Sequence, residues 1–208
     1  AAGVLRLDEQ LAYSRADLQP WSPVTEGLLG EGSMAVAALC AATLATSDNT
    51  AANLLLARLG GPTAVTTFLR SLGDPVTRLD RYEPEMNAPH PEWDSSAPRA
   101  MAHSLHALLL GDVLAPPHRA RLKAWLQASV TGGRRLKAGL PVGWSIAEKT
   151  GTSDSGSTND IGVVWSPRGE PLVVAAFIRN SRAPHAQREA ALADVGRLAA
   201  GVADTGGG

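Results

Sequence analysis

The first segment with side chains that could do chemistry is Ser47-Asp48-Asn49. It places a hydroxyl, a carboxylate and an amide between two stretches of helical composition. A break between two helices can project such side chains into a cleft. Ser, Asp and Asn are also the preferred N-cap residues, so a structural cap for the following helix is the alternative. Taken alone, the segment favours the cap.

The second segment is Arg81-Tyr82-Glu83-Pro84-Glu85-Met86-Asn87, in a proline-dense stretch that predicts a long surface loop over residues 81–98. A carboxylate at Glu83 and an amide at Asn87, four residues apart, could hold a water molecule between them. Long loops in compact domains are usually functional or disordered. Ordinary solvation of the loop by polar side chains is the alternative.

The third segment is Lys149-Thr150-Gly151-Thr152, and Lys149 is one of only three lysines in the chain. A lysine beside a short hydroxyl and a glycine combines charge, a small donor and an unobstructed backbone, which suits an anion. A lysine at the end of a strand is otherwise commonplace. This segment too carries little weight alone.

Residue periodicity predicts the elements that must position these segments. The fold class is mixed α+β (α/β): an antiparallel sheet flanked by helices, plus a helical part. We expect one catalytic domain made of a mostly helical part at residues 1–129 and a sheet-and-helix part at 130–208. Helices are predicted at 34–46, 49–59, 63–72, 100–110, 117–128 and 184–200, and strands at 144–149, 161–165 and 172–178. Residues 1–6 resemble the interior of a helix, and residues 206–208 predict a disordered tail.

Composition excludes several classes of protein. The 208 residues carry 19 Lys+Arg and 20 Asp+Glu, a net charge of -1, which argues against a nucleic-acid partner. A hydrophobic content of 44% is enough for a core, and no apolar run is long enough for a membrane span. The single cysteine, Cys40, excludes an intrachain disulfide framework. His103 and His106 are three residues apart on a predicted helix but lack a third ligand, so we expect surface histidines and not metal ligands.

The types, order and spacing of the three segments together resemble the class A serine β-lactamases. The likeness is supported by residues 47–56, 76–87 and 158–161, and it extends from residue 1 to about residue 200. It implies a β-lactamase/penicillin-binding transpeptidase-like fold and hydrolysis of β-lactams through a serine acyl-enzyme. It further implies a small-molecule β-lactam as partner, a monomer without cofactor, no membrane partner, and a periplasmic or secreted location.

The resemblance also implies roles for the catalytic residues. Glu83 is expected to act as general base on the water that hydrolyses the acyl-enzyme, and Asn87 to help hold that water. Ser47 is expected to relay a proton to the lactam nitrogen as the ring opens. Lys149 is expected to support this relay and to attract the substrate carboxylate. Asp48 is expected to organise its own turn.

Substrate-binding roles follow from the same resemblance. Thr150 is expected to hydrogen-bond the substrate carboxylate beside Gly151, and the backbone N–H of Thr152 to supply half of the oxyanion hole. Asn49 is expected to contact the substrate amide. Trp21 matches an aromatic residue at the mouth of the cleft, with ordinary surface packing as the alternative.

An arginine usually assists the carboxylate site in this family, but Thr158 occupies its commonest position. Arg135 matches an alternative position, and the adjacent Arg134 is its competitor. If neither contributes, both are solvated loop charges.

Arg81 and Asp94 match the ion pair that closes the neck of the glutamate loop. The resemblance implies a loop that is two residues shorter than is usual in the family. Cys40 matches a position that forms a disulfide in some members, and a buried free thiol is the alternative.

One motif of the family does not occur. The residues three positions before the lysines are Ala120, Arg134 and Ile146, so the 208 residues contain no Ser-x-x-Lys. We therefore expect a C-terminal portion that lacks the nucleophile. One alternative is a catalytically inactive module that binds β-lactams or peptidoglycan. The other is a relative of the penicillin-binding D-alanyl-D-alanine peptidases, against which Glu83 argues.

The missing motif predicts that the isolated 208-residue chain does not hydrolyse a chromogenic cephalosporin. Substoichiometric acylation should also be absent, because no activated serine is available. Absorbance assays and intact-protein mass spectrometry check both points. Turnover at enzymic rates, in preparations free of other β-lactamases, would contradict this prediction.

Overall fold

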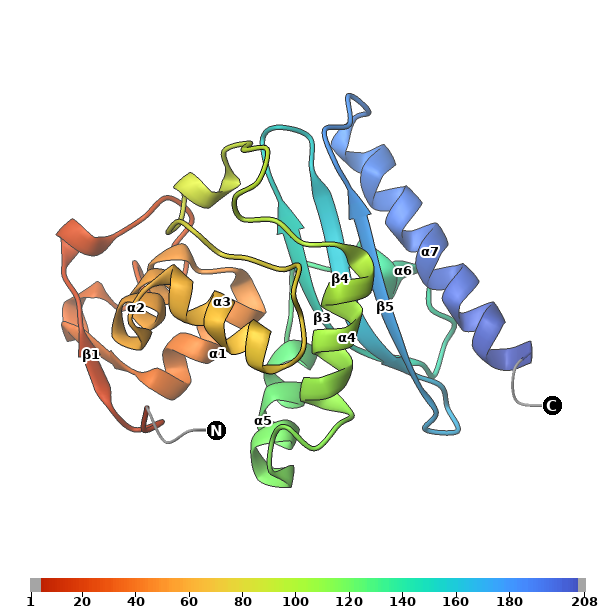
Figure 1. Cartoon of the computed structure of the whole chain (residues 1–208), viewed down its shortest axis with the longest axis horizontal. Helices are drawn as coiled ribbons and strands as arrows, with labels where there is room; N and C mark the ends of the chain where they lie inside the picture. The colour runs from red at the N-terminus through yellow and green to blue at the C-terminus, as the bar shows by residue number, and fades with distance from the viewer. Residues whose placement is uncertain (1–4, 206–208) are drawn as a thin grey trace. The chain divides into compact units, whose positions relative to one another are not determined.

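The computed structural model describes residues 5–205, and of Asp204 and Thr205 only the backbone. The chain divides into two compact units, one ending at Ser96 and the other beginning at Ala97 (Figure 1). Residues 1–4 and the predicted disordered tail at 206–208 lie outside the described residues. Residues 5–9 are irregular, so the helical start is wrong for the part that is described.

The reason for this irregular start lies in the helix that it contacts. Helix α1 spans Val36–Thr46, and its N-cap residue Ala35 makes no side-chain cap. The carbonyl oxygens of Leu7 and Glu9 accept hydrogen bonds from the N–H groups of Ala37 and Val36, each at 2.9 Å. An extended N-terminal segment thus satisfies donors that a helix leaves unpaired at its first turn.

Three helices and a two-stranded sheet build the first unit. Helix α2 spans Asn49–Leu59 and ends at Gly60, whose positive φ of 98° suits glycine; α3 spans Pro62–Ser71. Strands β1 (Gln10–Ala12) and β2 (Ser33–Ala35) pair antiparallel. Short 3₁₀ turns occur at η1 (Arg15–Asp17), η2 (Leu29–Glu31) and η3 (Glu85–Asn87). The buried core consists of Tyr13, Met34, Leu39, Ala42 and Ala51.

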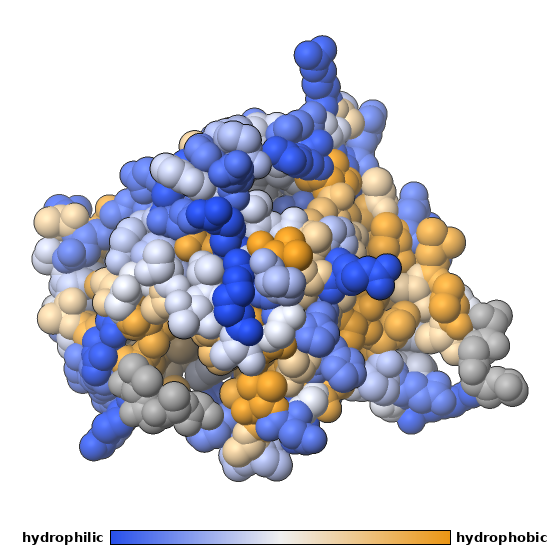
Figure 2. Space-filling view, in the orientation of Figure 1, coloured by the Kyte–Doolittle hydropathy of each residue, from blue (hydrophilic) through white to orange (hydrophobic). Residues whose placement is uncertain are grey.

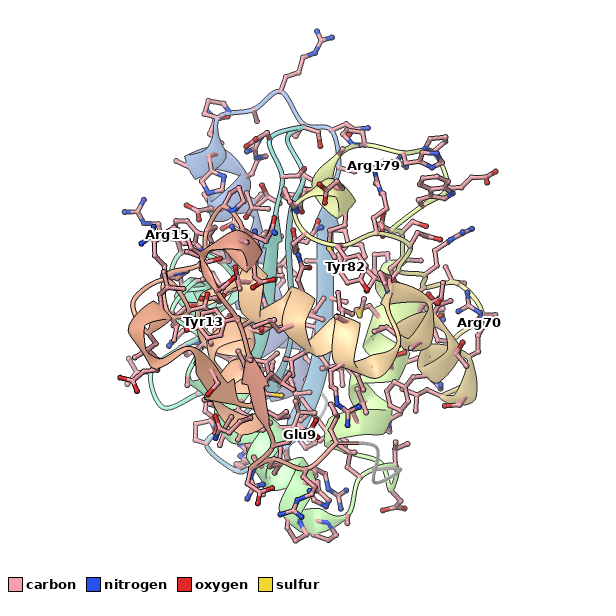
Figure 3. The ribbon with its side chains drawn as sticks, turned by 90° about the vertical axis from the view of Figure 1, so that its left-hand side faces the viewer. Glu9, Tyr13, Arg15, Arg70, Tyr82 and Arg179 are labelled. Atoms are coloured by element: carbon pink, nitrogen blue, oxygen red, sulfur yellow. The ribbon has the colours of Figure 1, made fainter. Side chains whose placement is uncertain are left out.

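The hydroxyl of Tyr13 is the polar group at the edge of this core. Figure 3 shows Tyr13 in the first unit, together with Glu9 and Tyr82. The Tyr13 hydroxyl donates to the carbonyl oxygen of Thr25 at 2.8 Å. A tyrosine can therefore be buried here without an unsatisfied hydroxyl.

The second unit is built on an antiparallel sheet in the order β3-β4-β5. The strands span Ser145–Thr152, Thr158–Trp165 and Pro171–Ile178. Helices α4 (Pro98–Leu109) and α5 (Pro116–Gln127) pack on the sheet, and α7 (His185–Thr205) packs on β4 and β5 (Figure 1). The core beside α7 contains Leu136, Ile146, Val164, Val174, Ala176 and Leu192.

These elements confirm the predicted mixed α/β class with an antiparallel sheet. The predicted helices and strands occur within a few residues of their expected bounds, whereas β1, β2 and the four-residue α6 (Leu136–Gly139) are additional. Strand β3 continues through Thr152, so Thr150, Gly151 and Thr152 lie within the strand that was expected to end at Lys149. The expected parts divide at residue 129, whereas α4 and α5 belong to the compact unit that contains the sheet.

Apolar side chains also reach the surface of the second unit (Figure 2). On α7, Leu198 and Val202 are exposed, while Leu192 and Ala200 are buried. Single exposed apolar residues of this kind are ordinary on globular proteins.

Helices α6 and α7 approach so closely that glycines are required between them. A Cβ at Gly196 of α7 would overlap the carbonyl oxygen of Leu136, and a Cβ at Gly139 would overlap that of Ala193. Gly201, also on α7, has no atom near its Cβ position. The two glycines of α7 therefore face different surroundings.

We predict that Gly196→Ala lowers the free energy of unfolding by about 1–3 kcal/mol, because the added methyl group must displace backbone. Gly201→Ala is the matched control and should raise it by about 0.5–1 kcal/mol through helix propensity. Urea denaturation followed by circular dichroism measures both. Equal stability of the two variants would show that α6 and α7 are not in close contact.

Candidate functional site

The turn at Ser47-Asp48-Asn49 joins α1 to α2. Ser47 is the C-cap of α1 and has left-handed backbone angles, φ 59° and ψ 41°. Such a conformation is costly for a residue other than glycine, and it persists where the surroundings fix it. Residues of this kind cluster at functional sites, which favours Ser47 as more than a connector.

Asp48 holds this turn in place. Its side chain is fully buried, and Oδ1 accepts from the N–H of Ala51 at 2.9 Å and from Thr25 Oγ1 at 2.8 Å. Oδ2 accepts from the N–H groups of Val24 and Thr25, both at 2.9 Å. The prediction that Asp48 organises its own turn is confirmed.

Trp21 lies beside this turn. Its indole N–H donates to the carbonyl oxygen of Thr46 at 2.9 Å, and its own carbonyl accepts from the N–H of Asn49 at 3.0 Å. The Asn49 side chain donates to the carbonyl of Pro20 at 2.8 Å. With 66% of its surface exposed, Trp21 is anchored through its N–H and not through packing. The structure thus brings Trp21, Ser47 and Asn49 together.

Glu83 and Asn87 meet in the proline-dense loop. Asn87 Nδ2 donates to Glu83 Oε2 at 2.5 Å. Residues 81–98 contain only the short η3 turn before α4 begins, as their proline content predicts. The two side chains therefore contact each other directly, so a water molecule shared by them would lie beside the pair and not between them.

Asn53 is a functional candidate that the sequence did not single out. Its Oδ1 accepts from the N–H of Glu83 at 2.9 Å, and its Nδ2 donates to the carbonyl oxygen of Glu83 at 2.8 Å. Both hydrogen-bonding groups of one side chain thus fix the backbone that carries Glu83. Asn49 and Asn53 lie one helical turn apart on α2, which is the signal that could have identified it.

The neck of this loop is closed as predicted. Arg81 Nε binds Asp94 Oδ2 at 2.6 Å, and the Asp94 side chain is nearly buried. Asp94 Oδ1 also accepts from the N–H groups of Asp80 and Arg81, at 2.7 and 3.0 Å. The predicted Arg81–Asp94 ion pair is confirmed.

The Lys149-Thr150-Gly151-Thr152 segment forms the end of β3. Lys149 Nζ donates to the carbonyl oxygen of Thr150 at 2.7 Å. Thr150 Oγ1 lies 2.6 Å from Thr131 Oγ1, which ties the strand to the segment that precedes α6. Gly151 pairs with Asn159 across the strands, and no backbone atom lies near its Cβ position.

Arg135 lies beneath this end of β3 and is only 4% exposed. Its NH1 donates to the carbonyl oxygens of Gly151 and Asn159 at 3.0 and 2.8 Å, and NH2 donates to Thr152 Oγ1 at 2.6 Å. Arg134, by contrast, is exposed. Thr158 is completely buried. Arg135 is therefore not a solvated loop charge.

An acid on α7 accompanies this arginine. Arg135 Nε lies 3.6 Å from Glu189 Oε1, and His185 Nε2 lies 3.2 Å from the same oxygen. Glu189 is buried, so the arginine is its main source of opposite charge. The sequence did not indicate this contact, which packing of α7 creates.

Two buried acids of the second unit were also missed. Glu148 and Asp160 are 1% and 0% exposed. Burial, and next the charge of Glu148, raise the pKa of Asp160 to about 8. Burial likewise raises the pKa of Glu148. Their inward positions on strands with apolar neighbours were the available signal.

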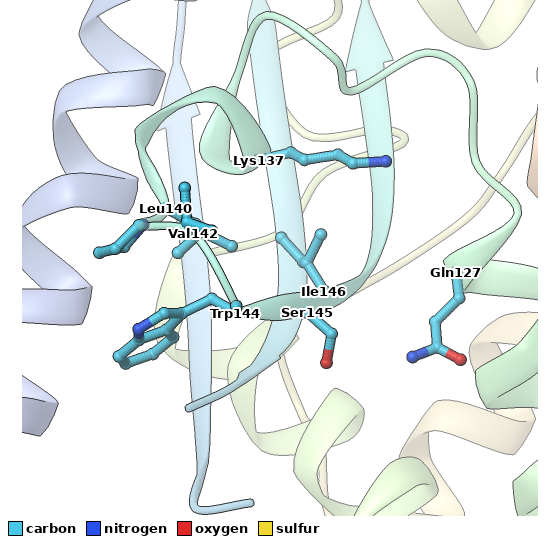
Figure 4. Close-up of a pocket in the computed structure, with 9 residues that line it drawn as sticks. Gln127, Lys137, Leu140, Val142, Trp144, Ser145 and Ile146 are labelled. Atoms are coloured by element: carbon cyan, nitrogen blue, oxygen red, sulfur yellow. The ribbon is translucent and has the colours of Figure 1, made fainter. Parts of the chain in front are cut away.

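Two surface pockets of the second unit are lined by none of the predicted catalytic or substrate-binding residues. A surface pocket of about 390 Å³ is lined by Lys137, Trp144, Ser145 and Ile146, among others (Figure 4). Ser145 begins β3, whereas Lys149 to Thr152 end it. A second pocket, of about 510 Å³, contains Thr131, Arg134 and Glu189 and so borders the Arg135 segment.

Among the described side chains, which are those of residues 5–203, no three His, Cys, Asp or Glu gather where they could hold a metal ion. Cys40 is a half-buried thiol, and burial raises its pKa.

Each unit contains its own part of the predicted site residues. The first unit contains Trp21, Ser47, Asn49, Glu83 and Asn87, and the second contains Arg135, Lys149, Thr150, Gly151 and Thr152.

Comparison with known proteins gives a consistent family. A sequence model described as the β-lactamase enzyme family matches residues 1–203. β-Lactamase FAR-1 of Nocardia farcinica is 50% identical over 170 residues, covering 81% of this chain and 54% of the relative. The carbapenem-hydrolysing β-lactamase KPC of Klebsiella oxytoca is 44% identical over 196 residues, covering 93% and 67%.

Solved structures agree. A class A β-lactamase reconstructed as the last common ancestor of Gram-negative bacteria is 51% identical, with a TM-score of 0.92. The match covers 95% of this chain and 76% of that one. The chain thus spans 54% of the length of the Nocardia relative and 67% of the length of the Klebsiella relative.

We predict that Arg135→Ala lowers the free energy of unfolding by about 3–5 kcal/mol, because it leaves Glu189 buried with only His185 beside it and removes three hydrogen bonds from the β3–β4 pair. Arg134→Ala is the matched control and should change it by no more than about 0.5 kcal/mol. Urea denaturation at neutral pH measures both. An Arg135→Ala variant as stable as the parent would contradict the buried network.

Proposed function

The chain belongs to the class A serine β-lactamase family, and from this premise we propose that the protein hydrolyses β-lactam antibiotics through a serine acyl-enzyme. The observation that carries the proposal is the Glu83–Asn87 pair at 2.5 Å, on a backbone clamped by Asn53. A carboxylate held in this way is suited to activate water. Penicillin-binding peptidases lack this glutamate, so the pair favours hydrolysis over slow release.

In the proposed deacylation step, Glu83 removes a proton from a water molecule, whose oxygen attacks the ester carbonyl of the acyl-enzyme. The C–O bond to the serine then breaks, and the serine oxygen takes up the proton. Asn87 donates a hydrogen bond to Oε2 of Glu83 and so fixes the plane of the carboxylate. Asn53 sets the position of the Glu83 backbone and acts as a positioning residue.

In the proposed acylation step, Ser47 passes a proton to the lactam nitrogen as the ring opens, and Lys149 supports this transfer. The left-handed backbone of Ser47, at φ 59°, supports the role, since the turn is fixed by Asp48. Asn49 is proposed to contact the substrate amide and Trp21 to border the cleft.

The substrate carboxylate is proposed to bind at the end of β3. Lys149 supplies charge, Thr150 donates a hydroxyl, and Gly151 leaves the backbone accessible. The N–H of Thr152 is proposed to form half of the oxyanion hole. Arg135 adds positive charge through its hydrogen bond to Thr152 Oγ1. Hydrogen bonds to charged groups contribute about 1.5–3 kcal/mol each.

The nucleophile is the part of this machinery that the 208 residues do not supply, since they contain no Ser-x-x-Lys. Acylation is therefore proposed for a protein that holds this stretch together with such a segment. For the stretch alone, binding of β-lactams without turnover is the second candidate, and the absent motif is what favours it.

We further propose a monomer located in the periplasm or secreted, which rests on family membership. No described helix is both long and apolar enough to cross a membrane.

The test joins the Ser-x-x-Lys segment of a class A relative in cis to this chain, and the product is called the supplemented chain here. Hydrolysis of penicillin and of a chromogenic cephalosporin is then measured. Turnover is expected with the segment and not without it. If the supplemented chain binds β-lactams but never turns them over, the binding module is the better account.

In the supplemented chain, we predict that Glu83→Gln lowers the rate of deacylation by about 10²–10⁴, because the general base is lost. Acylation should remain, so mass spectrometry should show penicillin attached to the protein. Glu85→Gln, an exposed neighbour in the same loop, is the control and should turn over normally. Normal turnover by Glu83→Gln would show that Glu83 is not the base.

A further inference from the structure

Glu148 and Asp160 lie side by side on the face of the sheet that includes Ile146 and Val164. Asp160 is paired directly opposite Thr150, and Glu148 precedes Thr150 by two residues on the same face of β3. Lys149 points to the other face. The two acids are thus neighbours of Thr150 and not of the Lys149 side chain.

Residues 131–136, called the arginine segment here, cover these acids and are tied to both strands. Thr131 binds Thr150 through their hydroxyls at 2.6 Å. The N–H of Leu136 donates to Asp160 Oδ2 at 3.1 Å. Gly132 packs against Glu148 so closely that a Cβ there would overlap its carboxyl group. The arginine segment therefore packs directly on the two acids.

Three of the four carboxyl oxygens of the pair lack a hydrogen-bond donor among the described residues. Within the described part of the chain, both oxygens of Glu148 and Oδ1 of Asp160 have no hydrogen-bond partner. Burying ionised carboxylates without donors is costly, and two adjacent negative charges are costlier still. One proton placed between the two carboxyl groups supplies a donor and removes one charge.

Charged groups on the surrounding elements act on the pair. Arg135 and Lys137, from the arginine segment and α6, attract negative charge to it. From α7, Glu189 faces Arg135 and offsets part of that attraction, and His185 faces Glu189. Burial outweighs both cations, since the pKa of Asp160 is raised to about 8 and that of Glu148 is raised as well.

We propose that Glu148 and Asp160 share one proton at neutral pH and act as a positioning pair that holds the arginine segment, and hence Arg135 and Thr150, in place. The structural part of this inference stands on the described contacts. Its consequence for the β-lactam carboxylate rests on the proposed function. Neither acid is a catalytic residue, because each acts through the arginine segment.

Loss of the shared proton has a defined direction. The pKa of Asp160 is raised in the folded state from 3.8 to about 8, so the folded chain holds one proton more than the unfolded chain between these pH values. The unfolding equilibrium constant should therefore rise with pH across this window, by up to about tenfold per pH unit, and level off above it.

The first test measures urea unfolding of the 208-residue chain between pH 5 and pH 9 (about the window of the shift). Asp160→Asn should abolish most of the slope, because the amide carries no titrating proton. Asp154→Asn, at an exposed aspartate of the β3–β4 connection, is the matched control and should keep it. Equal slopes in the three proteins would overturn the proposal.

The second test looks at the arginine segment itself. Backbone amide resonances of residues 131–136, followed by NMR, should shift with a midpoint near the pKa of about 8 in the parent and in Asp154→Asn. They should not shift in Asp160→Asn. The infrared carbonyl band of a protonated carboxyl group should be present at pH 7 and weakened in Asp160→Asn. If Asp160→Asn does not fold, Glu148→Gln replaces it. Absence of the band in the parent would overturn the shared proton.

The third test uses the supplemented chain. The KM for penicillin should rise by about tenfold from pH 7 to pH 9 in the parent and stay level in Asp160→Asn, with kcat changing less in both. A parent KM that is flat over this range would overturn the positioning role. If the supplemented chain is inactive, the proposed function fails, and the first two tests still decide the acid pair.

Discussion

Backbone groups that lose their partners where helices and strands end must find others, and at two such ends of this chain buried charged side chains supply them. At the junction of α1 and α2, the carboxylate of Asp48 accepts hydrogen bonds from three residues. The guanidinium of Arg135 donates to two carbonyl groups near the end of the β3–β4 pair. Each charge can be buried only because several groups form hydrogen bonds with it. The unpaired backbone groups at these two ends in turn need the charged side chain as their partner. Ser47 and Asn49 flank Asp48, and Gly151 and Thr152 bind Arg135, so the positions of these four residues depend on the two charges.

Features that are set by residues close together in the sequence could be predicted from the sequence. Helix α2 was predicted at its observed bounds because Asp48 and Gly60 are local start and stop signals. The loop at 81–98 follows from proline, which acts through its own ring. Glu83 and Asn87 were identified together because they lie four residues apart. Local rules and a family resemblance were sufficient for these residues.

The remaining features arise from contacts distant in sequence, which local rules do not describe. Asn53 meets Glu83 thirty residues later in the chain, and Glu189 meets Arg135 only because α7 packs back on the sheet. The strands β1 and β2 are too short for a periodic pattern. Arg135 was identified by family likeness, yet its burial and its partners could be learned only from the structure. The extended course of residues 5–9 likewise depends on the first turn of α1.

The loop that carries Glu83 is held at two separate places. Asn53 fixes the backbone of Glu83, while Asp94 binds Arg81 and closes the neck. Residues 88–93 contribute to these anchors only through Arg81, which binds the carbonyl of Ala88 and makes a cation–π contact with the ring of Trp93. Changing the length of a flexible stretch has a small entropic effect, about 0.6 kcal/mol per doubling. Insertions or deletions in this stretch are therefore expected to leave the carboxylate in place.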